Sequence, residues 1–232
     1  MRLLRNSLLV ATVVVLTMAG SANAGIVNLL SSVGGAPSGV TLDNLNIIPL
    51  GAGGGTSATG LVVSFTGGGQ ATVGTSPNYF FAAPYLSGSN GTGFGNAPVP
   101  GADNTTYLTS GLGTVKLVMP ASELYFGLLW GSVDAYNTLE FYNGTTLVAS
   151  VTGSQVAAIP NGDEGINGTR YVNIGFDVLT PFNNVIARST QYAFELDNVA
   201  YNQTNPLPEP TSMLLLGTGL IGLAAAWRKR KA

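Results

Sequence analysis

The sequence predicts an all-β protein, a single β-sandwich with a signal helix before it and a transmembrane helix after it. Short runs of β-branched and aromatic residues recur along the chain and are separated by turn residues. The chain has 32 glycines, 9% charged residues and 45% hydrophobic residues, which favours a folded, turn-rich domain over disorder. An apolar period typical of helices occurs only in the two terminal segments.

Strand-like runs fill the body of the chain, residues 25–205. In chain order they are 40–48, 60–66, 105–109, 113–119, 123–130, 138–142, 145–151, 170–176, 182–189 and 192–201. Many short strands at this spacing are typical of a β-sandwich.

Two of these runs carry a sharper signal. Residues 124–130 are apolar on both faces, so we expect a central strand that is covered on both sides. Asn143 and Gly144 lie between two runs of β-forming residues. This dipeptide predicts a hairpin with a type I′ turn, in which both residues take a positive φ.

Residues 1–24 are predicted to form a secretory signal peptide. Two arginines begin the segment, an apolar stretch follows at 8–18, and Ala22 and Ala24 form a small-residue cleavage pattern. Cleavage is expected after Ala24. The alternative is an uncleaved N-terminal anchor.

Residues 206–232 form a second targeting segment. It begins with Pro208, Glu209 and Pro210, and an apolar run at 213–227 follows. Four consecutive cations then stop transfer across the membrane: Arg228, Lys229, Arg230 and Lys231. By the positive-inside rule these cations stay cytoplasmic, which places the preceding body on the other side of the membrane.

The apolar run is short for a permanent membrane anchor. A helix over 213–227 spans about 22 Å, whereas the hydrocarbon core is about 30 Å thick. A marginal span fits a transient sorting anchor better than a permanent one.

The proline-glutamate-proline element, the short apolar helix and the terminal basic cluster, in this order, resemble a PEP-CTERM sorting signal. The resemblance implies a bacterium that makes exopolysaccharide and recognition by an exosortase, a membrane-embedded, cysteine transpeptidase-like enzyme. That enzyme is expected to cut near Pro208, Glu209 and Pro210, and to release or transfer the body to the cell surface or matrix. The alternative is an ordinary single-span anchor with a proline-rich stalk.

Composition excludes several classes of function. All eleven acidic residues lie between Asp43 and Glu209, where only Lys116, Arg170 and Arg188 are basic, so the body is acidic and no nucleic-acid partner is expected. The chain has no cysteine and no histidine. This excludes Ser-His-Asp and Cys-His nucleophilic sites, His/Cys zinc sites and haem ligation by His or Cys within the chain.

Carboxylates are therefore the remaining candidates for chemistry. Glu195 and Asp197 alternate on one strand, as do the carboxylates of laminarinase-like glycoside hydrolases. In those enzymes a third carboxylate further along the strand is the acid/base. Here the corresponding residue is Val199 or Ala200, and neither can act as an acid or a base. If the protein were a carboxylate-dependent glycosidase, its catalytic residues would come from a pool of five candidate carboxylates, Glu123, Asp134, Glu140, Glu164 and Glu195.

A calcium site is the second candidate. Asp43 lies near the first strands, and Asp197 and Asn198 lie on the last strand. First and last strands often lie close together in a sandwich, and carboxylate and amide oxygens suit Ca²⁺. The alternative is that these residues only make turn hydrogen bonds. No other cofactor is predicted.

A glycan platform is the third candidate. Aromatic residues gather in or near the long Gly/Pro/Asn/Ser stretch 77–101, and core packing explains them equally well. They are Tyr79, Phe80, Phe81, Tyr85, Phe94 and Tyr107.

The body also resembles a recurrent ectodomain of PEP-CTERM surface proteins, through its segments 130–134, 136–139, 143–144, 170–172 and 194–199. That resemblance implies a jelly-roll-like sandwich similar to carbohydrate-binding modules.

Together these observations predict an exported bacterial cell-surface or extracellular-matrix protein. Its role is expected to be structural or interactive, not enzymatic, and linked to exopolysaccharide. Its expected partners are an exosortase-type enzyme, the membrane and exopolysaccharide. The alternatives are a carbohydrate-binding module that retains exopolysaccharide and a carboxylate-dependent glycosidase.

Overall fold

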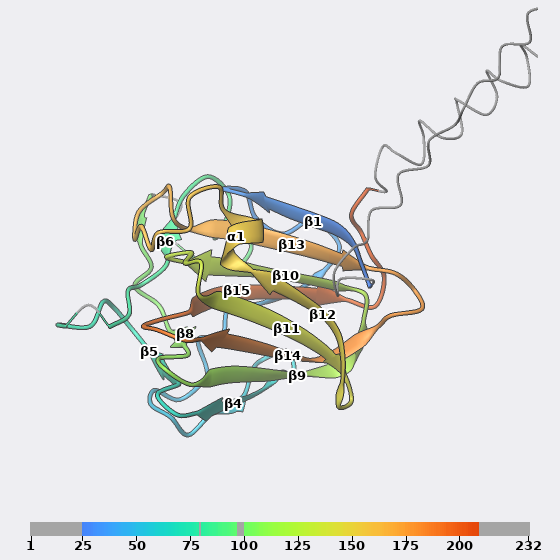
Figure 1. Ribbon diagram of the computed structural model, residues 1–232, viewed down its shortest axis with the longest axis horizontal. Helices are drawn as coiled ribbons and strands as arrows, with labels where there is room; N and C mark the ends of the chain where they lie inside the picture. Colours follow the sequence, from blue (N-terminus) through green and yellow to red (C-terminus); the bar gives the residue numbers. More distant parts are fainter. Residues whose placement is uncertain (1–24, 79, 97–99, 209–232) are drawn as a thin grey trace, which may run out of the picture.

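The computed structural model describes residues 25–78, 80–96 and 100–208, and over these residues two antiparallel sheets pack face to face (Figure 1). The prediction of an all-β protein is confirmed. Within the described part of the chain, no helix is long and apolar enough to cross a membrane. The two predicted targeting helices lie outside the described residues.

The first sheet, sheet A, has seven strands and provides the surface on which the polar sites are built. Its path is β1 (Ile26–Ser32), β13 (Arg170–Phe176), β10 (Tyr125–Gly131), β15 (Glu195–Asn202), β8 (Tyr107–Thr109) and β5 (Gln70–Thr72). The short strand β2 (Thr41–Asp43) also pairs with β15.

The second sheet, sheet B, has six strands. Its order is β12 (Thr146–Thr152), β11 (Asn137–Asn143), β14 (Phe182–Ser189), β9 (Thr114–Glu123), β4 (Val62–Thr66) and β3 (Gly55–Thr56). Two further strands, β6 (Tyr85–Leu86) and β7 (Gly101–Ala102), pair only with each other. The helix α1 (Gly153–Val156) is a single turn after β12.

The main core lies between the sheets and is rich in aromatic rings. Phe126 of sheet A packs edge-on against Phe141 and Phe182 of sheet B, with ring centroids 5.6 and 6.1 Å apart. Trp130 stacks on Phe194 at 4.1 Å. Because the chain has no disulfide, this packing carries the stability of the body.

Strand β10 confirms the expected central strand. All seven of its residues are buried, and it pairs with β13 on one side and β15 on the other. Phe126, Leu128 and Trp130 face the main core, whereas Tyr125 and Leu129 join a second apolar cluster on the outer face of sheet A. Uniformly apolar sequence here reflects burial on both faces.

The predicted hairpin exists, but its turn is placed one residue later than expected. Asn143 pairs with Thr146, so Gly144 and Thr145 form the two-residue loop. Gly144 has a φ of +60°, whereas Asn143 is not among the positive-φ residues. Glycine in the first central position is the arrangement of type II′ turns, so the prediction of a type I′ turn at Asn143-Gly144 was wrong.

The strand predictions also differ from the structure. The strands β1, β3, β5, β6 and β7 were not predicted, and the run 40–48 forms a strand only over Thr41–Asp43. The Asp43 and Asn44 side chains accept hydrogen bonds from the backbone two residues on, and Leu45 has a φ of +56°. These local bonds end the strand in favour of a turn.

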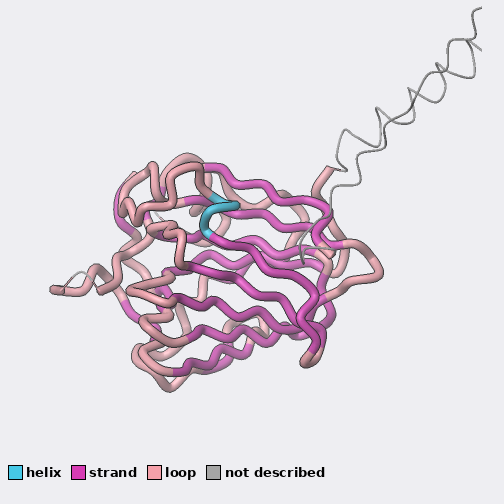
Figure 2. The backbone as a smooth tube through the Cα atoms, viewed as in Figure 1, coloured by secondary structure: helices cyan, strands magenta, loops and turns pink. Residues whose placement is uncertain are grey.

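Both chain ends of the body lie at the same end of the sandwich (Figure 1). The Asn28 side chain on β1 donates a 2.8 Å hydrogen bond to the Pro208 carbonyl oxygen, and Asn205 donates one to Asn28. Figure 2 shows that the longer loops gather at the opposite end. The molecule therefore has a proximal end, near residues 25 and 208, and a distal end.

Candidate functional site

A long segment covers the outer face of sheet A. This covering segment, made of the described residues between 73 and 106 (all but 79 and 97–99), includes β6 and β7, and its Leu86 and Phe94 pack in the outer apolar cluster. The Ala82 backbone N–H donates to Glu195 Oε1 at 3.2 Å, and the Tyr85 N–H donates to Thr169 Oγ1 at 3.1 Å. The segment therefore encloses polar side chains that a bare sheet would expose to water.

A polar pocket opens where this segment meets the distal end of sheet A. This distal pocket has a volume of about 200 Å³. It lies away from the chain ends. Glu195, which lines the pocket, is the first residue of β15 and pairs with Gly131, whereas the last residue of β15, Asn202, lies at the other end of the strand and pairs with Tyr125. Its lining includes Phe80, Ser132, Asp134, Tyr136, Tyr192 and Glu195.

Two stacked aromatic rings form one wall of the distal pocket. The ring centroids of Phe80 and Tyr192 lie 4.5 Å apart with the ring planes at 20°, and the two residues remain 45% and 43% exposed. The Tyr136 hydroxyl donates to the Tyr192 carbonyl oxygen at 2.8 Å. An exposed ring pair beside hydrogen-bonding groups offers a flat apolar surface to a ligand.

Glu195 is a buried carboxyl group at the base of this pocket. The Ser132 hydroxyl donates to its Oε2, and burial is the main cause that raises the pKa of Glu195 to about 8. Burial likewise raises the pKa of Asp134, whose charge adds to the shift at Glu195. Glu164 lines the pocket from an exposed loop.

The alternation predicted for Glu195 and Asp197 is present. They pair with Gly131 and Leu129 of β10, and Leu129 belongs to the outer cluster. The strand then bulges at Asn198, which has a φ of +48°, and Val199 points into the main core. Neither Val199 nor Ala200 supplies a third acid beside the pair.

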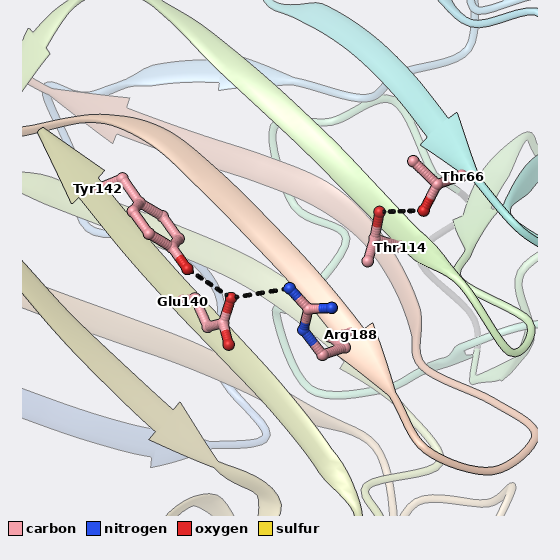
Figure 3. Close-up of polar contacts among 5 residues, drawn as sticks. All are labelled: Thr66, Thr114, Glu140, Tyr142 and Arg188. Atoms are coloured by element: carbon pink, nitrogen blue, oxygen red, sulfur yellow. Dashed lines mark hydrogen bonds and ion pairs between the residues drawn. The ribbon is translucent and has the colours of Figure 1, made fainter. Parts of the chain in front are cut away.

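The other carboxylates of the predicted catalytic pool lie apart. Figure 3 shows Glu140 on sheet B, where its Oε2 accepts hydrogen bonds from Tyr142 and Arg188 at 2.9 and 3.2 Å. Glu123 lines a separate cavity of about 460 Å³ with Tyr201 and other residues. The pool therefore does not form one cluster.

The residues of the predicted calcium site separate across sheet A. Leu42 and Ala200, which pair with each other, join the outer cluster, so Asp43 and its partner Val199 face the inner side. Asp43 accepts hydrogen bonds from Ser57, Thr59 and the Leu45 backbone. Asp197 faces outward, beneath the covering segment. Among the described residues, no three carboxylates gather closely enough to form a metal site.

The predicted aromatic platform divides into three parts. Phe80 and Phe81 line the distal pocket, Phe94 and Tyr107 are buried, and Tyr85 is half-buried. Tyr79 lies outside the described residues. Tyr192 completes the exposed pair but was missed, because it lies more than a hundred residues from Phe80 and no local pattern joins them.

The targeting residues fall largely outside the described part of the chain. Pro208 is the last described residue and is exposed. The remaining predicted targeting residues, Ala22, Ala24, Glu209, Pro210, Arg228, Lys229, Arg230 and Lys231, lie outside it.

Comparison with known families identifies this terminal segment. Residues 206–231 match the model of the PEP-CTERM protein-sorting motif. No curated protein and no solved structure matches the chain. The motif implies a precursor that is exported, membrane-anchored and processed by an exosortase.

Proposed function

Because the chain ends in a PEP-CTERM sorting motif, we propose that it is a protein of the bacterial cell surface or extracellular matrix with a structural or interaction role linked to exopolysaccharide. In this proposal residues 1–24 start export and a transmembrane helix within 206–232 holds the precursor. The jelly-roll-like sandwich between them is the working part, and it is not an enzyme.

The observation that carries this proposal is the position of the motif directly after a folded body. The Asn28 side chain holds the Pro208 carbonyl beside β1, so the described body reaches the first residue of the Pro-Glu-Pro triplet, two residues inside the matched motif. A processing enzyme can therefore reach the motif without unfolding any strand.

Mass spectrometry of the mature C-terminus in the native cell tests this proposal. We expect mature surface protein without residues 228–232, and a variant with Pro208→Ala and Pro210→Ala that keeps them. Gln203→Ala, at an exposed residue before the matched motif, is the control and should be processed normally. A mature surface protein that still ends in Lys231 and Ala232 would contradict processing.

A second candidate function is saccharide binding in the distal pocket. The stacked, half-exposed rings of Phe80 and Tyr192 beside a polar pocket support it. The pocket lies at the end of the sandwich opposite the anchored end, so a surface glycan has access to it. In this candidate function, the distal pocket is the surface through which the protein interacts with the glycan.

Tyr192→Ala and Phe80→Ala should weaken binding to purified exopolysaccharide by about three- to tenfold, because each removes one stacking face. Tyr142→Ala, on sheet B, is the matched aromatic control. Isothermal titration calorimetry measures all three, and equal affinities would rule out binding at this pocket. Release of reducing sugars from exopolysaccharide, lost in Glu195→Gln, would instead contradict the non-enzymatic role.

A further inference from the structure

The cavity that Glu123 lines lies at the proximal end of the sandwich. This proximal cavity has a volume of about 460 Å³, within the range of small-molecule sites. Leu124, the residue after Glu123, accepts a backbone hydrogen bond from Phe176, and the next residue, Asp177, donates one to Gly25. Gly25 is the first described residue, so the cavity lies at the same end as the chain ends of the body.

A bulge in β9 forms one wall of the proximal cavity. The ladder between β9 and β14 pairs Val118 with Asn184 and then Glu123 with Phe182, so four residues of β9 lie opposite one of β14. Pro120 is one of these four residues and lines the cavity. Because proline has no N–H to donate, it cannot take part in a regular ladder. Glu123 is the residue at which the pairing resumes.

Glu123 is a buried carboxyl group in the wall of this cavity. Only 2% of the residue is exposed, and its Oε2 has no hydrogen-bond partner. Among the described residues, no basic side chain forms an ion pair with it. Burial raises the pKa of Glu123, which reflects the cost of a carboxylate without a compensating charge. Buried polar atoms are rarely left unpaired in native proteins, and such an atom beside a cavity indicates a missing hydrogen-bond donor.

Two hydroxyl groups in the lining of the cavity are left as acceptors. The Tyr201 hydroxyl donates to the Thr59 carbonyl oxygen at 3.0 Å, and the Thr59 hydroxyl donates to the Asp43 carboxylate. A hydroxyl group has a single hydrogen, so these two oxygens can only accept a further hydrogen bond. Thr41 and Gln203 also line the cavity and are exposed, so a ligand can enter from solvent.

These groups favour a ligand that carries hydrogen-bond donors and a positive charge. A water molecule or a neutral hydroxyl group would donate to Glu123 but would leave its buried charge uncompensated. A primary ammonium group supplies three donors together with the charge, and its hydrogen bonds to a carboxylate are stronger than neutral ones. An anionic ligand would be repelled by Glu123 and by Asp43, which is bonded to the lining residue Thr59.

We propose that the proximal cavity binds the ammonium group of a small primary amine, with Glu123 as its counter-ion and the Tyr201 and Thr59 hydroxyl oxygens as further acceptors. A free amine and the ethanolamine headgroup of a membrane lipid both present this group. Only the lipid source rests on the proposed anchoring of the precursor, which places the proximal end next to the membrane.

Titration of the full-length chain in detergent with ethanolamine and with ethylene glycol tests the site. The two probes have nearly the same size, and they differ in that an ammonium group replaces one hydroxyl group. Saturation-transfer difference NMR at pH 7 gives both affinities. Ethanolamine should bind at least about tenfold more tightly than ethylene glycol, because only the amine compensates the charge of Glu123.

Glu123→Gln keeps the shape of the side chain and removes its charge. It should weaken ethanolamine binding by about tenfold and leave ethylene glycol binding unchanged, and thermal unfolding verifies that the variant is folded. Glu140→Gln, on sheet B, is the matched control and should keep the wild-type preference for the amine. Equal affinities of the wild type for the two probes, or an unchanged preference in Glu123→Gln, would overturn the proposal. Binding of neither probe would mean that the cavity holds only water and would overturn it as well.

Reconstitution into vesicles distinguishes the two sources of the amine. The full-length chain is placed in phosphatidylcholine vesicles with or without phosphatidylethanolamine, and free ethanolamine is titrated. Weaker binding of free ethanolamine in the vesicles that contain phosphatidylethanolamine would support the site and identify the lipid headgroup as its occupant. Equal binding in both kinds of vesicle would support a site for a free amine.

Discussion

Glu123 shows how burial alone changes a carboxyl group in this protein. Its side chain is 2% exposed at the end of β9, and its Oε2 has no hydrogen-bond partner. Desolvation raises the pKa of Glu123, and no neighbouring cation offsets this shift. The charged form is therefore disfavoured in the folded state but not in the unfolded chain.

This difference predicts that Glu123→Gln stabilises the protein at neutral pH. At pH values between the pKa of Glu123 in the unfolded chain and its higher pKa in the folded protein, the native state binds more protons than the unfolded state. The free energy of unfolding therefore falls as the pH rises through this range. Glutamine does not titrate, so the substitution removes this loss of stability. Thermal unfolding should show a higher midpoint than wild type at pH 7 and no difference below about pH 4, where the carboxyl group is neutral in both states.

Glu140→Gln is the matched control for this prediction. Glu140 pairs with Arg188 on sheet B, so its neutralisation should not raise the midpoint at pH 7. A Glu123→Gln variant that unfolds at the wild-type midpoint at every pH would show that the buried carboxyl carries no penalty.

At the scale of elements, the sequence predicts burial better than it predicts turns and pairing. The uninterrupted apolar sequence of residues 124–130 identifies β10 as a central strand, because a strand that is buried on both faces has no solvent-facing position for a polar side chain. Alternation likewise places Glu195 and Asp197 on one face. The bulge at Asn198 has no local signal, since it depends on the register of β15 against β10.

The distal pocket could not be predicted from local patterns for a related reason. Phe80 lies in the covering segment and Tyr192 precedes β15, so only the tertiary fold brings their rings together. The covering segment itself has the composition of a flexible loop. Its order comes from contacts with sheet A, such as the Ala82 bond to Glu195, and not from its own propensity.

Gly153 at the start of α1 is an element-scale constraint on the distal pocket. A Cβ at this position would lie 1.9 Å from the Asp134 carbonyl oxygen, and Asp134 lines the pocket. Gly153→Ala should therefore destabilise the protein by about 1–3 kcal/mol through overpacking and displace the Asp134 loop. Urea unfolding measures the change.

Gly53→Ala is the control for Gly153→Ala. Gly53 has no heavy atom within 4 Å of the position of an added Cβ, so its substitution should change stability by less than about 1 kcal/mol. Equal unfolding midpoints for the two variants would show that the loop at Asp134 moves freely away from α1.

At the scale of the whole molecule, the two chain ends give the sandwich a direction. Gly25 accepts hydrogen bonds from Asp177 and Thr180, and Pro208 is held by Asn28, so both ends lie at the proximal end. The apolar run starts at residue 213, five residues after Pro208, and an extended chain over those five steps spans at most about 18 Å. In the anchored precursor the proximal end is therefore near the membrane.

This orientation can be measured because the chain has no cysteine of its own. Leu179 is 86% exposed at the proximal end, and Ile159 is 73% exposed beside Asn161 at the distal end. A fluorophore on Leu179→Cys should be quenched by spin-labelled lipid headgroups in the precursor, whereas one on Ile159→Cys should not. Detergent extraction should abolish the quenching. Equal quenching at both positions would mean that the sandwich lies flat on the membrane, with the distal pocket no longer facing outward.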